Sequence, residues 1–239
     1  MKLYSYWRSS SAWRVRTGLA WKGIPYTYEA VHLLKEHQHQ DTYRGKNPMG
    51  FVPMLEWEEG GTTRRLTQSM AILDYLEQRF PAPPLLPADP FLRARARQLA
   101  EMVNSGIQPF QNLSTLGYIK SIGVDDRAWI QHFLPRGLTA LERVVQETAG
   151  KFCVGDAPSL ADVYLVPQLY AARRFKIDLT PSPPWSGLTR RVRPCLPSRQ
   201  RTPTDSRTRS PLRDKEGLAH GNERIPRTAR HRIRPLVRP

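Results

Sequence analysis

Residues 6–16 read Tyr6-Trp7-Arg8-Ser9-Ser10-Ser11-Ala12-Trp13-Arg14-Val15-Arg16. Apolar residues before the serines predict a strand over Lys2–Tyr6, and the apolar spacing after them predicts a helix over Ser11–Lys22. Because a helix N-terminus has unpaired N–H groups and partial positive charge, this junction is suited to bind an anion, and we expect a thiolate. Serine also caps ordinary helices, so the three hydroxyls alone leave both interpretations open.

Two further motifs indicate a bound peptide. The first is Asn47-Pro48-Met49-Gly50-Phe51-Val52-Pro53-Met54-Leu55, in which a proline precedes an apolar strand. A cis proline in a tight turn there leaves the backbone N–H and C=O of Val52 able to pair with an extended ligand. The second is Leu66-Thr67-Gln68-Ser69, which leads into an apolar helical pattern. We expect the first N–H groups of that helix to face a carboxylate.

The order of the predicted elements indicates two parts of different class. In the first part we expect strands over Lys2–Tyr6, Tyr26–Val31, Pro53–Trp57 and Thr63–Leu66, and helices over Ser11–Lys22, Asp41–Gly45 and Ser69–Arg79. The proline-rich stretch Pro81–Pro87 cannot continue a helix and predicts a linker. Long helical patterns follow over Pro90–Leu116, Asp126–Thr148 and Ser159–Phe175. The fold class is therefore α/β plus all-α: a thioredoxin-like domain over residues 1–80, a linker over 81–89 and a helical domain over 90–181.

Three local features of the helical part carry their own expectations. Ser159-Leu160-Ala161-Asp162 has the form of a capping box, which gives Asp162 a structural role and not that of a catalytic acid. Pro135 lies inside an apolar helical pattern, where proline costs about 3 kcal/mol unless the helix kinks, so we expect a bend or a break. Cys153, between Phe152 and Val154, is expected to be a packed thiol and not a nucleophile.

The positive charge is concentrated at the C-terminus. Residues 1–181 contain 22 Lys and Arg and 17 Asp and Glu, a net charge of +5, whereas residues 182–239 contain 15 and 4, a net charge of +11. The C-terminal segment has 14 Arg, one Lys and nine Pro without helical or strand periodicity, so we expect it to be disordered. Such a composition is also what a GC-rich gene gives when it is translated in a shifted frame.

The composition and motifs of the chain argue against several other classes of protein. The chain has neither a stretch of about 18 apolar residues nor an apolar N-terminal signal, which favours a cytoplasmic protein without membrane contact. The two cysteines form no CxxC pattern and predict no disulfide framework. His32, His37 and His39 lack patterned cysteine or carboxylate ligands, so we expect no metal site. The Arg-rich end leaves a basic-tailed nucleic-acid-binding protein as a remote alternative, but few aromatic residues accompany it and we expect no nucleic-acid partner.

Two more segments complete a resemblance to a known family. They are Gln108-Pro109-Phe110-Gln111-Asn112-Leu113-Ser114 and Gly155-Asp156-Ala157-Pro158-Ser159-Leu160-Ala161-Asp162. Together with the serine, proline and Gln68-Ser69 motifs, they resemble the zeta class of glutathione transferases from Met1 to about Pro181. The resemblance is specific because several separated motifs occur in the same order at compatible spacing. It implies a glutathione transferase fold, glutathione as cofactor and a homodimer.

The resemblance also implies a reaction, namely the glutathione-dependent cis-trans isomerisation of maleylacetoacetate to fumarylacetoacetate in tyrosine and phenylalanine catabolism. Maleylacetoacetate is a dianion with a cis double bond conjugated to a ketone. Addition of a thiolate makes that bond rotatable, and loss of the thiolate then gives the trans isomer. Isomerisation of maleylpyruvate, general glutathione conjugation or haloacid processing, and glutathione binding without turnover are the alternatives.

Roles for individual residues follow from the same resemblance. The zeta motif Ser-Ser-Cys matches Ser9, Ser10 and Ser11, which are expected at the sulfur of glutathione, and Ser11 stands where many relatives have cysteine. The implied glutathione contacts are Gln38, Val52, Gln68, Ser69, Gln108, Asn112, Leu113 and Ser114. Arg8 and Arg174 are the candidates for binding the two substrate carboxylates, because arginine can pair with a carboxylate in bidentate fashion. Ordinary surface arginines are the alternative for both. Arg14 and Arg16 are expected to pair within the fold.

Overall fold

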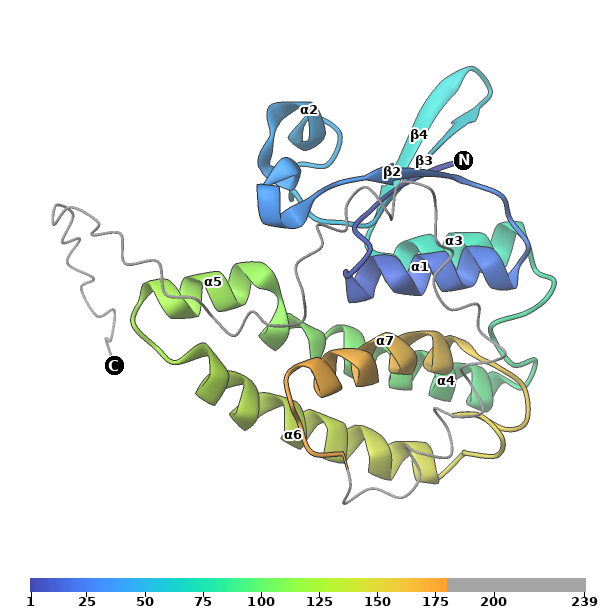
Figure 1. The fold of residues 1–239 in the computed structure, drawn as a ribbon. Helices are drawn as coiled ribbons and strands as arrows, with labels where there is room; N and C mark the ends of the chain where they lie inside the picture. The colour runs from blue at the N-terminus through green and yellow to red at the C-terminus, as the bar shows by residue number, and fades with distance from the viewer. Residues whose placement is uncertain (180–239) are drawn as a thin grey trace, which may run out of the picture.

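The structure, a computed structural model, describes residues 1–179 (Figure 1). The expectations for residues 182–239 therefore lie outside the described residues. In chain order, the N-terminal part contains β1 (Lys2–Ser5), α1 (Ser10–Trp21), β2 (Thr27–Ala30), η1 (Leu33–Lys35), η2 (His37–His39), α2 (Asp41–Arg44), β3 (Met54–Glu59), β4 (Thr62–Thr67) and α3 (Ser69–Arg79).

The strands of this part form one mixed sheet. Their order is β2-β1-β3-β4, with β1 parallel to β2 and antiparallel to β3, and β3 antiparallel to β4. Helices α1 and α3 lie side by side on one face of the sheet (Figure 1). They approach closely because Gly18 has no side chain: a Cβ there would overlap Leu73. This is the arrangement of a thioredoxin-like domain, and the predicted fold class is confirmed.

The second part is entirely helical within the described residues. Its elements are α4 (Pro90–Asn104), η3 (Gln108–Gln111), α5 (Leu113–Ser121), α6 (Asp126–Gln146) and α7 (Leu160–Arg174). Helix α7 packs against both α1 and α4, and α6 packs against α4 (Figure 1). One cluster of buried apolar side chains runs from Leu3 in β1 through Leu76 in α3 to Leu134 and Leu169 in the helical part. This shared core holds the two parts together.

The single helix predicted over Pro90–Leu116 is wrong, because this segment divides into α4, η3 and α5. Helix α4 ends at Asn104, and at Gly106 the backbone passes so close that a Cβ would lie 2.7 Å from the Met102 carbonyl oxygen. Pro109 then has no N–H to donate within an α-helix. The interruption matters for function because it turns the chain between α4 and α5 toward the N-terminal part.

Helix α6 passes through Pro135 as one continuous helix, so of the bend or break that we predicted there the break is wrong, and the bend stays a prediction. A proline in this position removes one backbone hydrogen bond. Buried apolar side chains before and after it, including Leu134, Leu138 and Leu141, pack into the core and offset that loss.

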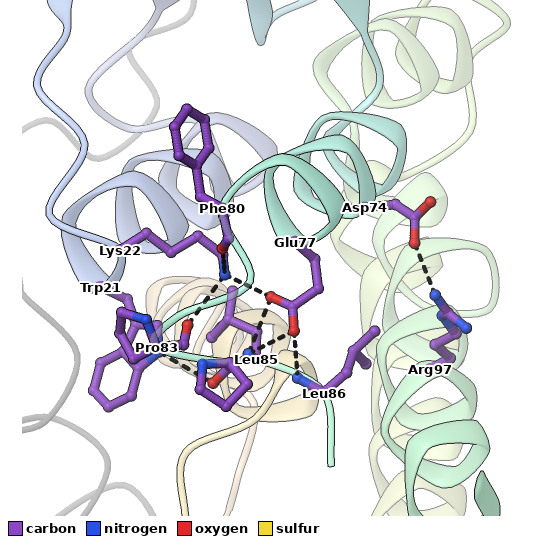
Figure 2. A network of polar contacts seen from close by, with 10 residues as sticks. Trp21, Lys22, Asp74, Glu77, Phe80, Pro83, Leu85, Leu86 and Arg97 are labelled. Carbon is purple, nitrogen blue, oxygen red and sulfur yellow. Dashed lines mark hydrogen bonds and ion pairs between the residues drawn. The ribbon is translucent and has the colours of Figure 1, made fainter. Parts of the chain in front are cut away.

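A buried ion pair fixes the linker between the two parts (Figure 2). Lys22 Nζ lies 2.7 Å from Glu77 Oε2 and also donates to the carbonyl oxygens of Phe80 and Pro83, at 2.6 and 3.1 Å. The Glu77 carboxylate accepts hydrogen bonds from the backbone N–H groups of Leu85 and Leu86. The pair therefore joins the end of α1, α3 and the linker in one network.

The predicted capping box at the start of α7 is confirmed. Asp162 Oδ2 accepts hydrogen bonds from the backbone N–H and the hydroxyl of Ser159, both at 2.8 Å, and Oδ1 accepts from the Cys153 N–H at 3.0 Å. Cys153 is buried, and burial raises the pKa of its thiol well above the ordinary value, so its packed character is confirmed. Within residues 1–179, the helices lack the combination of length and apolarity that a bilayer span requires.

Candidate functional site

A cavity of about 670 Å³ opens between the N-terminal part and the helical part. All of the candidate residues named from the sequence line it: Arg8, Ser9, Ser10, Ser11, Gln38, Val52, Gln68, Ser69, Gln108, Asn112, Leu113, Ser114 and Arg174. Segments that are more than 160 residues apart, such as those of Arg8 and Arg174, meet at this one place. The structure thus brings the candidates together, while their contacts with a ligand remain predictions.

The three serines at the start of α1 have different environments. Ser9 is the N-cap, and its Oγ accepts a hydrogen bond from the Ala12 N–H at 3.2 Å. Ser11 Oγ donates to Gln108 Oε1 at 3.1 Å. Within residues 1–179, the Ser10 hydroxyl has no hydrogen-bond partner. The capping interpretation is therefore correct for Ser9, and Ser10 is the hydroxyl that a ligand at this helix start can use.

The segment before β3 offers backbone groups to the cavity. The Val52–Pro53 peptide bond is cis, as the sequence predicted. The Phe51 carbonyl oxygen accepts hydrogen bonds from the Tyr43 hydroxyl and the Asn47 amide, both at 2.6 Å. Among residues 1–179, neither the N–H nor the C=O of Val52 has a hydrogen-bond partner. An extended peptide can therefore pair with Val52 as with the edge of a sheet.

The start of α3 is a second candidate position for binding an anion. Gln68, the residue before the helix, has φ 67° and ψ 120° and makes no side-chain cap, so the first N–H groups of α3 are left for a ligand. A non-glycine residue in this conformation is strained, and such strain is common in binding sites. Ser69 is buried, and its Oγ contacts Arg14 Nη1 at 3.2 Å and the Tyr164 hydroxyl at 3.1 Å.

Two arginines face the cavity without an acidic partner among residues 1–179. Arg8 lies over the Trp7 ring and Arg174 over the Phe175 ring, with 5.6 and 4.2 Å between the guanidinium carbon and the ring centroid. Partial burial and the charge of Arg8 lower the pKa of Arg174. Two like charges that share a cavity repel each other, and a doubly charged anion between them relieves that repulsion.

The other two arginines of the opening motif point into the fold, as predicted. Arg16 donates to Ser5 Oγ and to the carbonyl oxygens of Tyr6 and Trp7, at 2.8 to 3.2 Å. Arg14 is completely buried and donates to Ser69 Oγ and Asn104 Oδ1. Both arginines therefore stabilise the cavity wall from the protein interior.

Gln38 comes from η2, and its Oε1 is buried without a hydrogen-bond partner among residues 1–179. A ligand with an N–H group would satisfy it. Of the nearby histidines, His32 packs against Tyr6 and His37, with ring centroids 5.5 and 6.0 Å apart. In the described part of the chain, no three metal-ligating side chains are grouped as a metal ion requires.

Sequence reasoning missed several cavity residues. Leu34, Met49 and Tyr118 form an exposed apolar rim. Met49 lies inside the quoted segment 47–55, whereas nothing in the local sequence distinguishes Leu34 and Tyr118 from surface residues. Asn104 lies at the end of α4 and had no motif to mark it. Gln111 lies inside the quoted segment 108–114 and exchanges amide hydrogen bonds with Gln168, so that signal was present and was not used.

Comparison with known proteins gives one consistent result. Residues 3–84 match the model of the glutathione S-transferase N-terminal domain. Over 185 residues, which are 76% of this chain and 72% of the relative, the chain is 50% identical to the probable maleylacetoacetate isomerase 1 of Drosophila melanogaster.

Solved structures agree with this result. The crystal structure of maleylacetoacetate isomerase from Anaeromyxobacter dehalogenans with bound glutathione is 53% identical, with a TM-score of 0.76 over 84% of this chain and 96% of the other. A second structure of that enzyme, with bound dicarboxyethyl glutathione and citrate, is 52% identical, with a TM-score of 0.75 over 84% of this chain and 95% of the other.

Proposed function

Since the chain belongs to the zeta class of glutathione S-transferases, the family of the maleylacetoacetate isomerases, we propose that it isomerises maleylacetoacetate to fumarylacetoacetate with glutathione as cofactor. One observation carries the proposal: the same cavity holds a helix-start hydroxyl, that of Ser10, and the guanidinium groups of Arg8 and Arg174. A thiolate and a dianion can therefore bind next to each other.

The residues of the cavity fit glutathione. Among residues 1–179, Val52 offers a backbone N–H and C=O, Gln38 has a buried Oε1 without a hydrogen-bond partner, and the start of α3 has N–H groups without a side-chain cap. These groups match the peptide backbone, the amine or amide N–H groups and a carboxylate of the tripeptide. When bound, glutathione supplies a thiolate that adds to the cis double bond and leaves after rotation about it.

Ser10 is the residue that we place at the sulfur. Its hydroxyl can donate to a thiolate, and the N–H groups and partial charge of the α1 N-terminus add to that stabilisation. Ser9 shapes the helix start as its cap, and Ser11 connects it to Gln108 of the helical part. A serine at position 11 leaves no protein thiol in this motif, so the nucleophile belongs to glutathione.

Arg8 and Arg174 bind the two carboxylates of the substrate in this proposal. Both are guanidinium cations that lack an acidic partner among residues 1–179, so a dicarboxylate is their complementary ligand. The dicarboxyethyl glutathione bound to the bacterial relative supports this assignment, because it joins a dicarboxylate to glutathione.

Product analysis with three substrates tests the function. We expect the purified chain with glutathione to convert maleylacetoacetate with a higher kcat/KM than maleylpyruvate, and to displace halide from an α-haloacid more slowly than it isomerises either. A preference for maleylpyruvate would favour the related isomerase activity. Halide release as the fastest reaction would favour a conjugating transferase.

Cellular context completes the proposal. We place the reaction in tyrosine and phenylalanine catabolism, in the cytoplasm, and we expect a homodimer, all on the strength of family membership. The domain boundaries at residues 80 and 90 and the end of the helical domain near residue 181 belong to the same proposal.

A further inference from the structure

Arg14 is a buried cation directly behind the candidate glutathione site. Its side chain has no exposed surface, and its guanidinium carbon lies 4.2 Å from the centroid of the Tyr164 ring. Nη1 donates to Ser69 Oγ at 3.2 Å and to Asn104 Oδ1 at 2.9 Å. Nε and Nη2 have no hydrogen-bond partner among residues 1–179.

No carboxylate within residues 1–179 forms an ion pair with this guanidinium. The negative charge of Glu101 acts on Arg14 without an ion pair between them, and the Glu101 carboxylate accepts hydrogen bonds from Asn104 and Ser105. Burial lowers the pKa of Arg14 to about 10, so it remains protonated at neutral pH. A buried charge without a carboxylate in direct contact is costly, and a further anion nearby reduces that cost.

The contacts of Arg14 lead to one position on the cavity wall. Ser69 is the first residue of α3, the helix whose N-terminus carries no side-chain cap, and both Ser69 and Asn104 line the cavity. A serine hydroxyl accepts two hydrogen bonds and donates one. Arg14 donates to Ser69 Oγ, and either hydroxyl can be the donor between Ser69 and Tyr164. When an anion binds at the helix start, the Tyr164 hydroxyl can donate to Ser69 Oγ, which leaves the Ser69 proton to donate to the anion.

We propose that Arg14 is a positioning residue for the γ-glutamyl α-carboxylate of glutathione, to which it supplies a counter-charge through Ser69 without touching the ligand. The proposal rests on glutathione being the ligand of this cavity. It gives a function to an arginine in a core position where two of its donor atoms have no partner in the described part of the chain.

Arg16 provides the matched control. It lies two residues further along α1 and is also buried, but its guanidinium donates to Ser5 and to the backbone at the end of β1. Replacing Arg16 disturbs the fold near the serines but does not remove a positive charge next to the start of α3. Arg14 and Arg16 variants therefore separate the carboxylate effect from general loss of packing.

The test compares two ligands by calorimetry on the full chain: glutathione, and 4-aminobutanoyl-cysteinyl-glycine, which lacks only the α-carboxylate. For Arg14→Met we expect glutathione to bind about tenfold to a hundredfold more weakly, as for loss of a charge-assisted interaction, and the analogue to bind within about threefold of wild type. Arg14→Lys should show a smaller loss of the same selectivity, and Arg16→Lys should weaken both ligands equally.

Equal losses for the two ligands in Arg14→Met would overturn the role of Arg14 while leaving the function intact. If circular dichroism shows that Arg14→Met does not fold, Arg14→Lys decides in the same way: a loss confined to glutathione supports the proposal, and equal losses reject it. Failure of the wild-type chain to bind glutathione would reject the proposed function itself.

Discussion

Ser11 Oγ donates a hydrogen bond to Gln108 Oε1 at 3.1 Å, across 97 positions of sequence. This contact joins the first turn of α1 to η3 of the helical part, and Gln108 Nε2 in turn donates to Asn112 Oδ1 at 2.6 Å. The start of α1 is therefore held by contacts within the N-terminal part and by a contact with the helical part. It also means that two of the three serine hydroxyls are engaged within the protein, which leads to the first prediction.

Ser10→Ala should raise the thiol pKa of bound glutathione by about one to two units, more than Ser9→Ala or Ser11→Ala. A hydrogen bond to a charged group contributes about 1.5–3 kcal/mol, and one pKa unit corresponds to about 1.4 kcal/mol. Because the thiolate is the reactive form, the acid limb of the rate profile should move to higher pH by the same amount. Ultraviolet titration of the bound thiol measures it, and identical pKa values in the three variants would remove Ser10 from the sulfur.

Arg174→Ala should lower kcat/KM for the dianionic substrate by about tenfold to a hundredfold and leave the affinity for glutathione nearly unchanged. Steady-state kinetics with varied substrate at saturating glutathione provide the measurement. Arg173→Ala is the control, because Arg173 is an exposed neighbour that does not line the cavity. Equal effects of the two substitutions would assign Arg174 to the surface.

The ion pair of the linker predicts a contrast in stability. Lys22 is fully buried beside Glu77, so Lys22→Met leaves a buried carboxylate without its counter-charge and should reduce the free energy of unfolding by about 3 kcal/mol. Asp74 and Arg97 form a pair nearby whose side chains are both well exposed (Figure 2). Arg97→Ala should therefore cost less than about 1 kcal/mol. Urea unfolding of both variants compares them, and similar losses would contradict the account of the linker.

Asp162 carries a prediction about pH. Burial raises its pKa above the ordinary value of 3.8, although hydrogen bonds from Cys153 and Ser159 oppose the shift. The folded chain then binds the Asp162 proton more tightly than the unfolded chain does. Between the unfolded and the folded pKa, this residue makes the free energy of unfolding fall as pH rises.

Asp162→Asn should remove that contribution. The free energy of unfolding of the wild type minus that of the variant should therefore fall as pH rises just above 3.8. Asp162→Ala should in addition lose about 3 kcal/mol at neutral pH, because three hydrogen bonds to its carboxylate disappear. Urea unfolding at several pH values gives both results. A wild-type minus variant difference that rises with pH in this range would reverse the sign assigned to Asp162.

Local sequence signals were enough for most of the fold. Helix α3 has the predicted bounds Ser69–Arg79, and the four strands lie within one or two residues of their predicted positions, because apolar periodicity and turn residues act over short distances. Gly106 and Pro109 are sequence signals for the end of a helix after Asn104. We predicted one helix because the helical periodicity continues on both sides of them. The continuity of α6 at Pro135 depends on packing that the sequence does not display.

The sequence likewise predicted only part of the candidate site. Motif matching named residues that all line the cavity, since each motif has a local pattern. The burial of Arg14 against Asn104, 90 positions away, depends on how α1 and α4 both pack against α7, and no local pattern encodes it. For the same reason the sequence did not show that the Ser11 hydroxyl is engaged by Gln108, 97 positions away.

The most direct test of the central claim follows fumarylacetoacetate formation from maleylacetoacetate as glutathione is titrated into the purified chain, with free thiol quantified at the end. The account predicts a rate that saturates with glutathione, is negligible without it, and leaves the thiol concentration unchanged. A rate that is independent of glutathione, or one molecule of thiol lost for each molecule of substrate, would contradict it.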